Sequence, residues 1–165
     1  MNETVKAQGS SSRVLTFTLD HEHFALDIFT VREILDVSDI TRIPQAPEFM
    51  LGVVNLRGNA VPVMDLRRRF GMPPAARTVN SRIIIMEMLQ GGETTLIGAL
   101  ADSVKEVLEL DSGQIEPPPR MGTRVPIDFI TGIGKQGDRF ILLLNGERVF
   151  ALDAVLEAAS TADVA

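Results

Sequence analysis

Two short runs of this chain have residue types that could bind a metal or a nucleotide. His21 and His23 would point to the same face of a strand, but zinc needs three or four ligands and the chain has two histidines. We expect a solvated turn there and no metal site. The run Gly132-Ile133-Gly134-Lys135-Gln136-Gly137 has the spacing of a dinucleotide fingerprint. The fingerprint requires a helix N-terminus after it, whereas an apolar strand follows here, so we expect a hairpin turn and no cofactor.

Arg67, Arg68 and Arg69 form a basic run that could contact nucleic acid phosphates. Nucleic acid binding by a small barrel also needs stacking aromatic residues, but Trp and Tyr are absent and the net charge is -6. We therefore expect these arginines to form a solvated helical face. The chain has no cysteine, and no Ser/His/acid spacing or carboxylate pair stands out, so the sequence gives no positive sign of an enzyme.

The segment Asn55-Leu56-Arg57-Gly58-Asn59 presents one cation in an otherwise apolar region. Valines lie on both sides of it, and β-branched runs around a Gly/Asn segment predict two strands joined by a turn. Pro62 cannot donate to a strand ladder, which indicates an edge or a bulge. Two interpretations of Arg57 stay open, a surface arginine on a hairpin and a binding residue.

An internal repeat helps to separate these interpretations. The matching motifs are Val31-Arg32-Glu33-Ile34-Leu35 with Val104-Lys105-Glu106-Val107-Leu108, and Phe49-Met50-Leu51-Gly52-Val53 with Phe129-Ile130-Thr131-Gly132-Ile133. Glu33 recurs as Glu106, which favours a structural role. Arg57 does not recur in the second copy, which favours a functional role.

The remaining pattern predicts many short strands, which is typical of barrels and sandwiches. Strands are expected near residues 15–19, 24–28, 83–88, 95–101, 104–110 and 140–144, with a helical turn at 65–70 and a linker at 71–80. Leu152, Val155, Leu156 and Ala159 have the spacing of a short amphipathic helix. The polar start of the chain does not resemble a signal peptide and no apolar run is long enough to span a membrane, so we expect a cytoplasmic protein.

From about Val14 to Leu156 the chain resembles the CheW family of chemotaxis coupling proteins. The motifs that carry the resemblance are Phe24-Ala25-Leu26-Asp27-Ile28, Glu33-Ile34, Ile43-Pro44, the run from Gly52 to Gly58, Val61-Pro62-Val63, Asp65-Leu66, Asp102-Ser103-Val104, Glu106-Val107-Leu108 and Leu142-Leu143-Leu144. Asn145 departs from the family, which often has Asp there, but either residue can form the hydrogen bond of a turn.

The resemblance implies an all-β fold of two small five-stranded SH3- or OB-like β-barrels packed together, with a short C-terminal helix. Residues 1–12 would be a disordered tail and residues 158–165 a frayed one. Residues 13–157 would form one CheW-like domain with approximate halves 13–72 and 80–157, and an exchange of strands between the halves stays open.

The resemblance also implies a non-enzymatic adaptor without cofactors. Its partners would be the cytoplasmic tips of methyl-accepting receptors, bound in a groove between the barrels, and the regulatory domain of the histidine kinase CheA. The positions that match family receptor contacts are Val31, Glu33, Gly52, Arg57, Gly58 and Val104, and no kinase contact is assigned. Two alternatives stay open: an oligonucleotide-binding double barrel, and an enzyme that binds a nucleotide at the Gly132–Gly137 turn.

Overall fold

A computed structural model describes residues 11–90, 92–118 and 125–150. The expected C-terminal helix and both expected tails, apart from Ser11 and Ser12, lie outside the described residues. The strands are β1 (Ser12–Leu19), β2 (Glu22–Asp27), β3 (Val31–Asp36), β4 (Met50–Leu56), β5 (Asn59–Asp65), β6 (Arg82–Gln90), β7 (Glu93–Ala101), β8 (Ser103–Leu110), β9 (Ile115–Glu116), β10 (Ile130–Gln136) and β11 (Arg139–Leu144). The short helices are α2 (Leu66–Arg69), α3 (Gly146–Val149) and the 3-10 turns η1 (Ile28–Thr30), η2 (Ser112–Gln114) and η3 (Ile127–Phe129).

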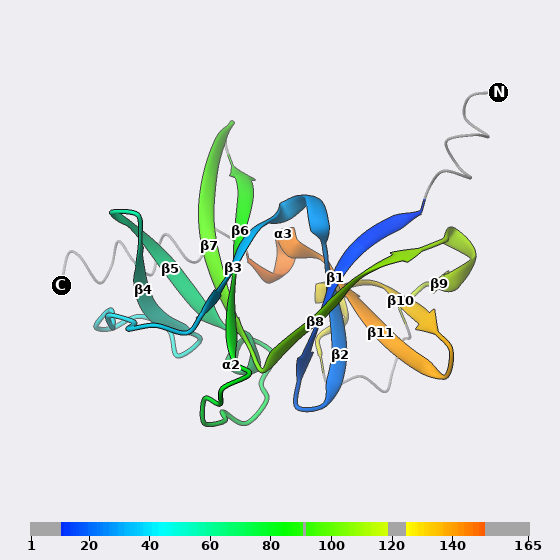
Figure 1. The fold of residues 1–165 in the computed structure, drawn as a ribbon, viewed down its shortest axis with the longest axis horizontal. Helices are drawn as coiled ribbons and strands as arrows, with labels where there is room; N and C mark the ends of the chain where they lie inside the picture. The colour runs from blue at the N-terminus through cyan, green and yellow to red at the C-terminus, as the bar shows by residue number, and fades with distance from the viewer. Residues whose placement is uncertain (1–10, 91, 119–124, 151–165) are drawn as a thin grey trace.

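The strands form two sheets that lie side by side, with α3 between them (Figure 1). The five-stranded sheet has the order β3-β6-β7-β5-β4, and the six-stranded sheet has the order β8-β1-β2-β11-β10-β9. The expected all-β fold is thus confirmed. One sheet has a sixth strand because the two residues of β9 pair with Ile133 and Gly134 of β10.

Three apolar clusters explain how these sheets pack. Val61, Val63 and Ile85 belong to a cluster inside the five-stranded sheet, while Val14 and Ile141 belong to one inside the six-stranded sheet. The largest cluster collects side chains from both sheets, including Phe17, Phe24, Ile84, Met86 and Phe150. Each sheet therefore curls around its own small core, and the third cluster joins the two sheets.

The two sheets have the same topology, but each takes strands from both halves of the chain. The antiparallel hairpin β1–β2 pairs with β8 and β11, whereas the equivalent hairpin β6–β7 pairs with β3 and β5. The residue offset that relates Phe49 to Phe129 also relates Gly52 to Gly132 and Phe70 to Phe150. Each half thus contributes its first hairpin to the sheet built mainly by the other half. The residue boundaries given above for the domain and its halves stay a prediction.

The three arginines of α2 do not form a solvated face, so that prediction was wrong. Arg67 donates to both carboxylate oxygens of Asp102, from Nε at 2.9 Å and from Nη2 at 2.6 Å, and its side chain is only 13% exposed. The guanidinium of Arg69 lies 4.9 Å from the ring centre of Phe49 and 4.8 Å from that of Phe129, the equivalent residue of the other repeat. Both arginines therefore hold the two halves of the molecule together.

The glycine-rich run of the second repeat is part of a strand pair. Residues 132–136 belong to β10, and Gly137 begins the turn into β11 with φ 62°. A Cβ atom on Gly134 would come within 2.8 Å of Leu110 Cδ1, so this glycine allows close packing inside the sheet. The run does not precede a helix and lacks the context of a dinucleotide site. No helix within the described residues has the length and apolarity to cross a membrane.

Candidate functional site

The turn that joins β4 to β5 has two residues, Arg57 and Gly58. Their φ angles are 52° and 88°, and two consecutive positive values define the tight turn that suits the twist of a hairpin. Asn55 Oδ1 accepts a hydrogen bond of 2.8 Å from the backbone N–H of Gly58. The sequence Asn-Leu-Arg-Gly therefore builds a fixed turn that projects the Arg57 side chain outward.

The Arg57 guanidinium forms a two-point ion pair with Glu33 of β3. Nη1 lies 2.8 Å from Oε2 and Nη2 lies 3.1 Å from Oε1. The hydrogen bond from Arg57 lowers the pKa of Glu33, and the hydrogen bond to Glu33 raises the pKa of Arg57. Because β3 and β4 are the two edges of the five-stranded sheet, this pair spans its open side. The Arg57 side chain is still 71% exposed, so the pair leaves it available to a partner.

Gly52 has a structural role that the sequence did not reveal. Its φ is 148°, and a Cβ atom there would lie 2.0 Å from the carbonyl oxygen of Thr41. Thr41 and Val53 exchange two backbone hydrogen bonds of 2.8 Å, which fasten the segment before β4 across the sheet. A Cβ atom on the equivalent Gly132 would lie 3.0 Å from the carbonyl oxygen of Glu116. Gly52 therefore allows the segment at Thr41 to pack closely against β4, the strand that leads to the Arg57 turn.

Val31 and Val104 lie where the two sheets meet. Val31 is on β3 and Val104 is on β8, and both are partly buried against the cluster that joins the sheets. The structure thus brings Arg57, Gly58 and Glu33 together, places Val31 two residues from Glu33 on one strand, and puts Val104 on the corresponding edge strand of the other sheet. Gly52 is buried on β4.

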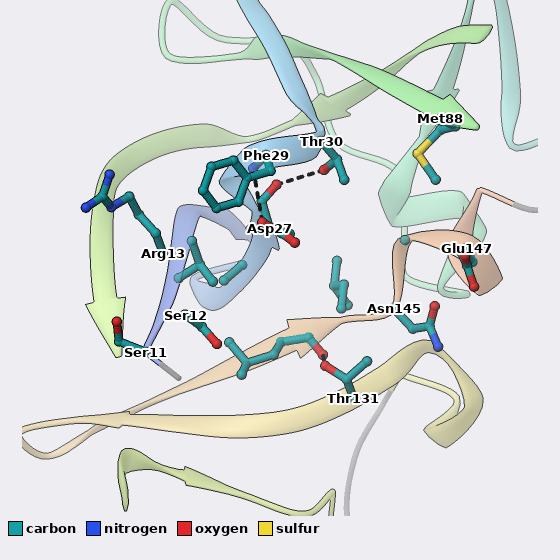
Figure 2. Close-up of a pocket in the computed structure, with 15 residues that line it drawn as sticks. Ser11, Ser12, Arg13, Asp27, Phe29, Thr30, Met88, Thr131, Asn145 and Glu147 are labelled. Atoms are coloured by element: carbon teal, nitrogen blue, oxygen red, sulfur yellow. Dashed lines mark hydrogen bonds between the residues drawn. The ribbon is translucent and has the colours of Figure 1, made fainter. Parts of the chain in front are cut away.

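A pocket of about 450 Å³ opens at one end of the six-stranded sheet (Figure 2). Its apolar floor includes Val14, Ala25 and Leu143 from the core of that sheet, and Phe29 stands at the rim with 82% of its surface exposed. Asp27 fixes this rim because its Oδ1 accepts the Phe29 N–H at 3.0 Å, as Figure 2 shows. No pattern in the sequence pointed to Phe29 or to this pocket.

The described part of the chain has no group of three or more His, Cys, Asp or Glu side chains placed to hold a metal ion. It also has no buried side-chain nitrogen or oxygen without a hydrogen-bond partner. Asn145 caps α3 through a hydrogen bond of 3.2 Å from the Arg148 N–H to its Oδ1, the turn role expected for it.

Comparison with known proteins shows which family, relatives and solved structure this chain resembles. The family model described as a CheW-like domain matches residues 13–154. The chemotaxis protein CheW of Klebsiella aerogenes is 34% identical over 137 residues, which are 83% of this chain and 80% of that protein. The probable chemotaxis protein CheW of Rhizobium etli is 32% identical over 152 residues, covering 92% of this chain and 96% of the relative. The crystal structure of the scaffolding protein TtCheW from Thermoanaerobacter tengcongensis superposes with a TM-score of 0.77 at 38% identity, covering 87% of this chain and 95% of the other.

Proposed function

The chain belongs to the CheW-like domain family of chemotaxis scaffold proteins, and from that premise we propose that it couples methyl-accepting receptors to the histidine kinase CheA. It acts as an adaptor without catalysis, in the cytoplasm, at receptor arrays that it joins through protein contacts. The receptor tip binds across Arg57, Gly58 and Glu33 and along the junction between the sheets, where Val31 and Val104 lie. The regulatory domain of CheA binds elsewhere on the surface.

The observation that carries this proposal is the geometry of Arg57. A fixed turn projects the Arg57 side chain, which is 71% exposed although its guanidinium is already bound to Glu33 at two points. An exposed pair of this kind adds little to stability, because both groups stay close to water. It does orient the guanidinium and keep its remaining N–H donors at the surface. Polar groups fixed beside a partly apolar junction are typical of a site that binds an amphipathic helix.

The first experiment exchanges the charges of the pair. Arg57→Glu and the double variant Arg57→Glu/Glu33→Arg are compared with the unchanged protein in pull-downs with a receptor cytoplasmic tip. We expect both variants to lose receptor binding while their melting temperatures stay within about 2 °C, because surface changes have small effects on stability. If the double variant regains full binding, the pair acts only by bracing the sheet and Arg57 is not a receptor contact.

The second experiment separates the two partners. Gly58 has φ 88°, and a Cβ atom there meets no atom within 4 Å, so Gly58→Ser strains the backbone without a clash. We expect a cost of about 1–2 kcal/mol, which a domain of this size tolerates. Receptor binding should fall while binding to the CheA regulatory domain persists. Equal loss of both partners with an unchanged melt would contradict separate surfaces.

A further inference from the structure

A polar cleft of about 630 Å³ lies beside the turn between β1 and β2, away from the Arg57 pair. The β1–β2 hairpin, the segment before β6, the β7–β8 segment and the beginning of β11 line it. The charged and titratable residues that line it are His21, His23, Asp102, Lys105, Glu106 and Arg139. The cleft therefore collects four basic or proton-binding groups and two acids from segments that are far apart in the sequence.

Among the described residues, two cations and one carboxylate of this cleft, Glu106, have no ion-pair partner, so positive charge exceeds negative charge. Asp102 is engaged by Arg67 at 2.6 Å, whereas Lys105 and Arg139 make no ion pair with any described residue. The pKa of His23 also reflects these two cations. Its pKa is lowered by burial first and then by the charges of Arg139 and Lys105, which shows that both cations act on this imidazole.

The repeat provides an internal comparison for this imbalance. Lys105 of β8 corresponds to Arg32 of β3, whose Nη1 lies 2.7 Å from Oε2 of Glu87. The registers of β3 with β6 and of β8 with β1 make Thr18 the counterpart of Glu87. One copy of the repeat thus neutralises its strand cation, and the other copy has a hydroxyl group where the carboxylate would be.

We propose that this cleft binds acidic side chains of a protein partner, with Lys105 and Arg139 as the charge-pairing groups. Charge complementarity supports this occupant, because with Asp102 paired to Arg67 the lining keeps two cations against one carboxylate, Glu106. The cationic side chains come from β8 and β11, with the imidazoles from the β1–β2 hairpin. Such an open, divided set of donors suits several carboxylates along a flexible segment better than one compact anion.

The test uses three anionic probes and two charge-removing variants of the full chain. Binding of a decaglutamate peptide, inorganic phosphate and a decathymidylate oligonucleotide is measured by fluorescence or calorimetry at two salt concentrations. The variant under test is Lys105→Gln/Arg139→Gln. The control is Lys135→Gln, which removes the same type of charge from β10, where Lys135 Nζ already pairs with Glu116 at 2.5 Å. Lys105 and Arg139 are both exposed, so the double variant should fold like the unchanged protein. If its melting temperature changes, the single variant Lys105→Gln is used in its place.

We expect the peptide to bind in a salt-dependent way and the double variant to bind it at least about tenfold more weakly, while Lys135→Gln has no effect. Equal binding by all variants would overturn the proposal. So would preferential binding of phosphate or of the oligonucleotide, since either would show a site for another kind of anion.

The imidazole of His23 supplies a readout that is independent of affinity. The charged and titratable groups that line the cleft around it are His21 on its own hairpin, Asp102, Lys105 and Glu106 on the β7–β8 segment, and Arg139 on β11. A bound carboxylate offsets the two cations and favours the imidazolium, so the peptide should raise the pKa of His23 in an NMR titration. An unchanged His23 titration at saturating peptide would place the peptide elsewhere and overturn the proposal.

Discussion

Replacement of Gly52 by alanine should destabilise the protein far more than an ordinary glycine-to-alanine change. The added Cβ would lie 2.0 Å from Thr41 O, 2.7 Å from Thr41 C and 2.9 Å from Arg42 Cα. These are backbone atoms, so no side-chain rotation can relieve the overlap, and the Thr41–Val53 pairing has to open. The two hydrogen bonds of that pairing contribute roughly 1 kcal/mol each. Backbone strain at φ 148° adds about 1–3 kcal/mol. The expected loss is therefore about 3–5 kcal/mol, or about 10 °C in melting temperature.

Chemical unfolding of Gly52→Ala, with Gly58→Ala and Gly132→Ala as matched variants, measures this difference. Gly58 has open space around it, so its variant should lose only about 1 kcal/mol. A Cβ atom on Gly132 would lie 3.0 Å from Glu116 O and from Ile115 Cγ2, so the loss for Gly132→Ala should lie between those of the other two variants. If Gly52→Ala unfolds like the unchanged protein and loses only receptor binding, Gly52 is not needed for the Thr41–Val53 pairing and is a direct receptor contact.

Three further changes test charged groups in and around α2. Arg67→Met should cost about 2 kcal/mol in urea unfolding, because it removes a two-point ion pair that is mostly shielded from water. Burial alone would raise the pKa of Asp102, but hydrogen bonds from Arg67 and from the Asp20 backbone lower it overall. Its contribution to stability should therefore be present above about pH 4 and be lost as the pH falls through the lowered value, a dependence that Asp102→Asn should remove from pH-dependent melts. Burial raises the pKa of Asp65, whose carboxylate then costs stability at neutral pH. Asparagine can cap a helix, as Asn145 caps α3, so Asp65→Asn should keep the cap of α2 and remove the buried charge. The melting temperature of this variant should equal or exceed that of the unchanged protein at pH 7 and show no gain at pH 3.

Local patterns in the sequence were sufficient for most strands. Alternation at Leu15, Phe17 and Leu19 predicted β1, and the apolar run from Ile83 predicted β6, because strand faces and buried centres leave short-range signals. The tight turn at Arg57 and Gly58 was also visible. Partner strands were not, since a parallel contact such as β5 with β7 depends on residues far apart in the chain.

The candidate site and the basic run show where local reasoning ends. Arg67, Arg68 and Arg69 were predicted to form a solvated face because the sequence lacked the aromatic residues of a nucleic acid site, yet Asp102 and Phe129 contact two of them from distant segments. The pairing of Arg57 with Glu33 was equally invisible to spacing, although the family resemblance named both residues. The internal repeat was the most informative long-range signal, since it distinguished Arg57 from positions that recur.

The exchange of hairpins between the sheets has an evolutionary consequence. One copy of the repeat on its own would have its first hairpin without a sheet to complete, whereas two separate copies could trade hairpins and satisfy each other as a symmetric homodimer. In such a dimer every mutation would appear twice. Joining both copies in a single gene removes that constraint. The second copy can then have Gly137 at the position of Arg57, and Lys105 can lose the acid that Arg32 keeps, without a matching change in the other copy. Fusion of a swapped pair therefore lets one compact molecule present different surfaces to different partners.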